Sequence, residues 1–170
     1  MVNNSIIRLL ETATYAWKQS ALKRFELNKE DIETALDSLY NACLLRYTNN
    51  ELKDETEWSQ FINKTSEDVR LCLSSIGFYV FSNLSKFKTQ WLSEDWQSWR
   101  RICRILSEIA FLKETYHSHI TDEEFEDIEI EYWEKFLISI GGGGYLPEEF
   151  IPFDFPESHW WWWYPDSKPT

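Results

Sequence analysis

The distribution of glycine and proline constrains the fold of this chain more than any other sequence feature. The first 140 of its 170 residues contain one glycine, Gly77, and no proline. The other four glycines form a block at 141–144, and all five prolines follow that block. Strand-rich folds need frequent turns, and glycine and proline are the residues that most often build them. The sequence therefore predicts an all-α fold.

Apolar residues recur at helical spacing in six segments of this glycine-poor region. We expect helices over about 5–26, 28–47, 55–63, 66–81, 93–117 and 121–140. Asn28 and the pattern Thr121-x-x-Glu124 are typical helix-start signals. The segment 66–81 is apolar on nearly every side, which predicts the central helix of the bundle, and Gly77 within it indicates a close helix crossing rather than a break.

The glycine block divides the chain into two parts. Residues 1–140 are expected to form a compact bundle of about six helices, and residues 141–170 a tail. Consecutive glycines suit a helix cap followed by a flexible turn. The prolines of the tail predict extended backbone. A chain of this length fits one domain and buries roughly 70% of the surface of its unfolded form, so it needs no disulfide or metal ion to fold.

The three cysteines indicate a reducing compartment. Cys43, Cys72 and Cys103 lie singly in apolar helical stretches, and their number is odd. Buried free thiols are the natural interpretation. The N-terminus lacks the basic and apolar regions of a signal peptide, and no apolar run approaches the ~20 residues that span a bilayer. We therefore expect a cytoplasmic protein without a membrane contact.

Negative charge is concentrated near the C-terminal end. The net charge is −12, yet residues 1–120 carry 15 basic and 16 acidic residues. Residues 121–170 carry 2 basic and 13 acidic residues. Such a field repels nucleic acid and attracts basic partners. Within the expected helix 121–140 we expect an acidic stripe for a basic protein, formed by Glu123, Asp127, Glu131 and Glu134; an ordinary solvated helix face is the alternative.

Aromatic side chains dominate the tail. Two interpretations are open: the tail fills a groove of its own helical body, which the aggregation hazard of exposed rings favours, or it docks on a partner. In the second case it contributes Phe153, Phe155, Trp160, Trp161, Trp162 and Trp163 to the same partner-binding surface.

A smaller cluster combines tryptophan with arginine. Arg100, Arg101 and Arg104 follow Trp91, Trp96 and Trp99, and arginine interleaved with aromatic residues can contact single-stranded nucleic acid. Three arginines in an acidic chain are a weak signal, because they can also pair with the acidic C-terminal part of the same chain.

Metal and catalytic motifs have little support. Glu114-x-x-His117 has the spacing of di-iron bundle sites, but those sites need a second copy, which the sequence lacks. There is no nucleophile elbow, phosphate-binding loop or dinucleotide fingerprint. We expect neither a catalytic residue, nor a cofactor, nor a metal site.

Three functional hypotheses follow. The first is a non-catalytic, acidic protein-binding module, such as an inhibitor or immunity-type partner of a basic protein. The second is a small helical subunit of a larger nucleoprotein assembly, with the three arginines facing nucleic acid. The third is an unrecognised helical-bundle enzyme or ligand-binding protein, which would require a pocket with convergent polar groups.

Overall fold

The protein is all-α. The computed structural model describes residues 2–26, 28–48, 55–88, 96–139, 146–152 and 155–164. The described residues form five α-helices: α1 (Val2–Leu22), α2 (Lys29–Thr48), α3 (Glu55–Leu84), α4 (Trp96–Tyr116) and α5 (Ile130–Ser139). Four short 3-10 helices accompany them: η1 (Ser85–Lys88), η2 (Glu124–Ile128), η3 (Glu148–Phe150) and η4 (Trp160–Trp163).

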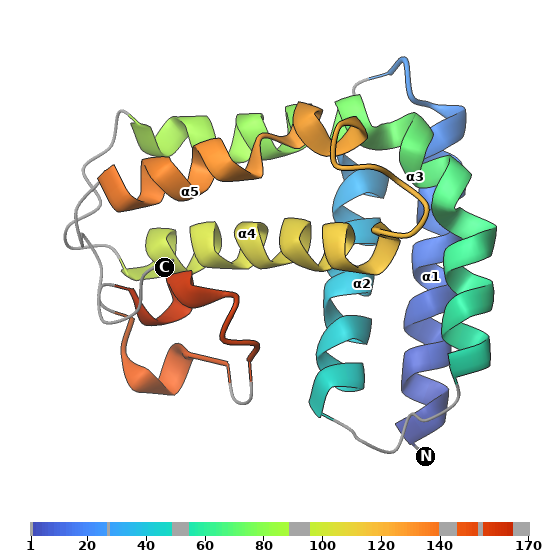
Figure 1. The fold of residues 1–170 in the computed structure, drawn as a ribbon, viewed down its shortest axis with the longest axis horizontal. Helices are drawn as coiled ribbons and strands as arrows, with labels where there is room; N and C mark the ends of the chain where they lie inside the picture. The colour runs from blue at the N-terminus through green and yellow to red at the C-terminus, as the bar shows by residue number, and fades with distance from the viewer. Residues whose placement is uncertain are drawn as a thin grey trace.

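The helices form two groups that meet at a corner (Figure 1). α1, α2 and the first half of α3 stand side by side, and α1 packs on both of the others. The second half of α3 turns away and runs along α4 and α5. The tail elements η3 and η4 lie along α4, and η4 packs on it. None of the described helices combines the length and the apolar character that a membrane-spanning helix needs.

The expected break between helices 55–63 and 66–81 does not occur. Thr65 lies in the interior of α3 and is fully buried. Its hydroxyl is 2.7 Å from the Phe61 carbonyl one turn earlier and 2.7 Å from the Tyr116 hydroxyl of α4. These two partners satisfy the Thr65 hydroxyl inside the helix, so this residue does not cap a new one. Hydroxyl contacts to the preceding turn often bend helices, and α3 changes direction along its length (Figure 1).

The most buried helix is α4, so the prediction that segment 66–81 is central was wrong. From Ile105 to Leu112 every residue of α4 is buried. Both helices pack on several elements, α4 on α2, α3, α5 and η4, and α3 on α1, α2, α4, η1 and η2. They differ in burial, because α3 leaves three large apolar side chains partly exposed, at Leu71, Phe78 and Phe81.

Gly77 lies inside α3 at a close crossing, as predicted. A Cβ atom at this position would lie 2.3 Å from the backbone carbonyl oxygen of Asp127. No side chain fits such a distance, so glycine allows η2 to lie directly on α3. This contact fixes where the acidic segment sits on the body of the protein.

Candidate functional site

The acidic segment forms two short helices instead of one. The hydrogen bonds expected of the capping-box pattern are present, because the Thr121 backbone N–H donates to Glu124 Oε2 at 2.8 Å and the Glu124 N–H donates to Thr121 Oγ1 at 3.3 Å. The first helical element, η2, nevertheless begins only at Glu124. However, Glu129 adopts a left-handed backbone conformation, with φ 53°, and it separates η2 from α5. The four predicted stripe residues therefore lie on two elements, with Glu123 and Asp127 at η2 and Glu131 and Glu134 on α5.

We call the exposed acidic side chains of this segment the acidic ridge; its members are Glu123, Glu126, Asp127, Glu129 and Glu131. Two flanking acids are used by the fold: Glu124 pairs with Arg70 at 2.8 Å and Asp122 pairs with Lys113 at 3.3 Å. Within the ridge, Asp127 accepts a hydrogen bond from Ser74 at 3.1 Å. Among the described residues, no lysine or arginine lies within ion-pair distance of the five ridge carboxylates.

Glu134 differs from the other predicted stripe residues because it is half-buried. Burial raises the pKa of its carboxyl group, and the neighbouring Glu131 carboxylate raises it further. Glu134 also lies beside the Trp160 side chain of the tail, which favours the charged form of the carboxylate. It therefore links α5 to the tail and is less accessible than the ridge residues.

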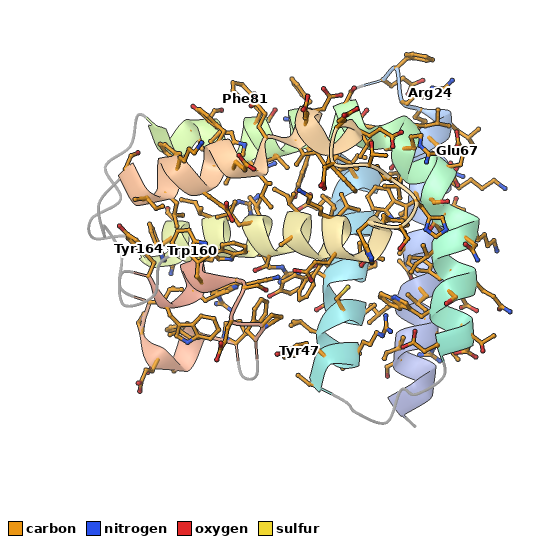
Figure 2. The ribbon with its side chains drawn as sticks, in the orientation of Figure 1. Arg24, Tyr47, Glu67, Phe81, Trp160 and Tyr164 are labelled. Carbon is orange, nitrogen blue, oxygen red and sulfur yellow. The ribbon has the colours of Figure 1, made fainter. Side chains whose placement is uncertain are left out.

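Exposed aromatic side chains border the ridge. Phe78 and Phe81 of α3 are 46% and 50% exposed, and Tyr132 of α5 is 43% exposed. The Phe81 ring lies 6.3 Å from the ring of Trp133 on α5, and Phe81 points outward from α3 (Figure 2). Because η2 packs on α3 and the Trp133 ring of α5 contacts Phe81 of α3, Phe81 and the acidic side chains share one surface.

The tail belongs to the core of the same chain. Phe155, Trp160, Trp161 and Trp162 are buried, and Trp163 is partly buried. Trp160 and Tyr164 lie where the tail meets the helical body (Figure 2), and their rings make an edge contact at 5.6 Å. Phe153 falls outside the described residues. The prediction that these rings form a partner-binding surface is corrected here, because their apolar area already covers α4.

A buried hydrogen-bond cluster that the sequence did not reveal holds the tail in place. Ser107 of α4 accepts hydrogen bonds from the indole N–H groups of Trp161 and Trp162, at 3.0 and 2.8 Å. Its Oγ also lies 2.9 Å from Nδ1 of His159, whose Nε2 lies 3.3 Å from Glu114 Oε1. A serine hydroxyl accepts two hydrogen bonds and donates one. With both indoles donating to it, the Ser107 hydroxyl is left to donate to Nδ1 of His159, and Nε2–H of this ring then donates to Glu114 Oε1.

This cluster has the residue types of a serine-hydrolase triad but lacks its chemistry. Ser107 is fully buried, and two indole donors occupy the lone pairs with which a nucleophile would attack. The serine and the histidine are 52 residues apart, and neither lies in a recognisable motif, so no local sequence signal could have indicated the contact. The cluster is a structural one.

The three cysteine thiols are also held in an unreactive state. Burial raises the pKa of the Cys43 and Cys72 thiols to about 12, and that of Cys103 well above its usual range. All three cysteines are buried and unpaired, as predicted. His117 uses Nδ1 for the Glu114 backbone carbonyl at 2.8 Å. In the part of the chain that the structure describes, no three histidine, cysteine, aspartate or glutamate side chains converge as metal ligands would.

The three arginines lie together on α4 but have different surroundings. Arg104 pairs with Asp37 of α2 and, at 3.3 Å, with Glu108. Arg101 donates to the Asn83 side-chain oxygen at 2.8 Å, and the Arg100 guanidinium lies 5.3 Å from the centre of the Phe150 ring of the tail. Asp37 and Glu108 both lie outside the acidic C-terminal part of the chain, so the predicted pairing with that part is found for none of the three arginines among the described residues.

Comparisons of the chain with protein-family models, with curated proteins and with solved structures give no match.

Proposed function

We propose that this chain is a non-catalytic, acidic protein-binding module, and that its partner presents a basic surface to the acidic ridge. The observation that carries the proposal is the lack of intramolecular counter-ions. Asp122 and Glu124 at the margin have basic partners, whereas the described residues offer none to the ridge itself. Like charges gathered without counter-ions oppose folding, and a basic partner removes this repulsion.

The aromatic border supports the proposal. Binding surfaces commonly place a few large aromatic anchors within a polar rim, and those anchors contribute most of the binding energy. Phe81 and Tyr132 have this position beside the ridge. The acidic ridge steers a basic partner to the site, and the aromatic side chains then hold it.

An inhibitor or immunity-type protein is the concrete form of this proposal, because a rigid acidic face can cover a basic active or nucleic-acid-binding site. A cytoplasmic location is part of it, since the protein is built around three reduced, buried cysteines. The tail takes no part in partner binding, as its rings are committed to the core.

Charge reversal on the ridge tests the proposal. We expect the chain to co-purify from its own cells with a basic protein, and Glu123→Lys/Glu131→Lys to abolish this at low salt. Rising salt weakens the wild-type complex because the attraction is screened. The matched control is Glu11→Lys/Glu33→Lys, which changes the net charge equally at exposed positions of α1 and α2. Equal binding by both double variants would refute the proposal.

A further inference from the structure

A second surface, on elements separate from the acidic ridge, has the opposite charge. A cavity of about 410 Å³ opens between α2, the first turns of α4 and the tail. Its walls include three arginines and three aromatic rings, contributed by Arg100, Arg101, Arg104, Tyr40, Phe150 and Trp162. We call it the arginine pocket. The pocket exists only because the tail packs on α4, since Phe150 and Trp162 form one of its sides.

Two of the three arginines in the pocket have no carboxylate partner among the described residues. Arg104 is neutralised by Asp37 and Glu108, and its guanidinium lies 3.8 Å from the centre of the Tyr40 ring. Arg101 binds the neutral side chain of Asn83, and the Arg100 guanidinium lies 5.3 Å from the centre of the Phe150 ring. Among the described residues, neither has a carboxylate within ion-pair distance. Two such cations in one cavity of a chain with net charge −12 indicate an anionic ligand.

The size and the walls of the cavity define the class of ligand. Guanidinium groups match the oxygens of a phosphate group in geometry as well as charge. The aromatic walls suit a flat ring, which arginine and phenylalanine can stack against. A volume near the lower end of the ~300–1,000 Å³ range of ligand pockets admits a small molecule. A long polyanion would also approach the acids of the tail and be repelled.

We propose that the arginine pocket binds a small molecule that carries a phosphate group next to a planar ring, which is the chemistry of a nucleoside monophosphate. Arg100 and Arg101 bind the phosphate, and the ring lies against the Phe150 side of the cavity. Arg104 and its two carboxylates hold the wall in place. This site is independent of the proposed protein-binding function.

Isothermal titration of the full-length chain at low ionic strength tests this proposal, with AMP, adenosine and inorganic phosphate as probes. We expect AMP to bind and adenosine to give no signal. Arg100→Gln and Arg101→Gln should each weaken AMP binding roughly tenfold, as the loss of a hydrogen bond to a charged group implies. The control Arg8→Gln removes an exposed arginine of α1 and should leave binding unchanged.

Each other outcome removes part of the proposal. No AMP binding by the wild type, or equal binding by the pocket variants and Arg8→Gln, would overturn the assignment of the site. Inorganic phosphate binding as tightly as AMP would refute the role of the aromatic walls. If a single-stranded RNA oligonucleotide binds far more tightly than AMP, the ligand of the pocket is a nucleic acid and the small-molecule proposal is refuted.

Discussion

At the scale of single residues, Ser107 connects the tail to the helical body. One hydroxyl satisfies the indole N–H groups of Trp161 and Trp162 and the ring of His159, all of them buried. Polar groups that lose their partner in a protein interior cost far more than the hydrogen bond itself contributes to stability. The position of the tail thus depends on the small side chain of Ser107, which no sequence motif singles out.

Ser107→Ala is predicted to destabilise the protein by roughly 2–4 kcal/mol, because it leaves at least two buried donors unpaired. Urea unfolding followed by tryptophan fluorescence measures this change. Ser139→Ala is the control, since the Ser139 hydroxyl is exposed and, among the described residues, hydrogen-bonds only the Phe136 carbonyl. A loss of stability no greater than that of Ser139→Ala would show that the cluster does not hold the tail.

Glu108 makes stability depend on pH. Burial raises the pKa of its carboxyl group to about 7, against the opposing effect of Arg104. The folded state therefore holds a proton that the unfolded state releases near pH 4.5, and stability falls as the pH rises from about 4.5 to 7. We predict that Glu108→Gln removes this dependence. The difference in the free energy of unfolding between the variant and the wild type should therefore be more favourable to the variant at pH 8 than at pH 4.5, by on the order of 2–3 kcal/mol. Urea unfolding of both proteins at the two pH values measures it; parallel pH profiles would contradict the assignment.

At the scale of secondary-structure elements, the contact between α3 and η2 places the acidic ridge. The backbone carbonyl of Asp127 lies where a side chain of residue 77 would be, and Ser74 bonds the Asp127 carboxylate. Glycine in a helix interior usually costs ~1 kcal/mol relative to alanine, so its presence here indicates that close packing outweighs helix propensity.

Gly77→Ala is predicted to destabilise the protein by about 1–3 kcal/mol, although the same change at an unhindered helical position is stabilising. The sign of the effect is the test, read from the urea midpoint. The variant should also weaken binding of a basic partner, because η2 must shift on α3. A stabilised variant would show that η2 does not press on α3 at this position.

Sequence reasoning succeeded where local chemistry decides the structure. Asn28 caps α2, with its Oδ1 3.4 Å from the Asp31 N–H, and Thr121 with Glu124 starts the acidic segment as expected. It failed where the structure depends on contacts between residues that are far apart in the sequence. Tyr116 keeps Thr65 inside α3, and the left-handed conformation of Glu129 has no sequence signal comparable to glycine. The charge asymmetry indicated the acidic ridge, but periodicity alone placed its residues on one helix.

At the scale of the whole molecule, opposite charges lie on different elements. The acidic ridge occupies η2 and the start of α5, whereas the arginine pocket lies between α2, α4 and the tail. The tail was expected either to pack on its own helices or to dock on a partner. Its described rings are mostly buried against the helices of the same chain. The sequence could not decide between these two roles, because an aromatic run suits both a core and an interface.

Zero-length crosslinking of the native complex with a carbodiimide tests the central claim most directly, since this reagent joins carboxylates to lysines that touch them. Mass spectrometry should find partner lysines attached to ridge residues, above all Glu123, Glu126 and Glu131. The account predicts that these links disappear at high salt, where charge attraction is screened. Links that involve instead Glu11 or Glu33, with the ridge unmodified by any partner, would contradict it.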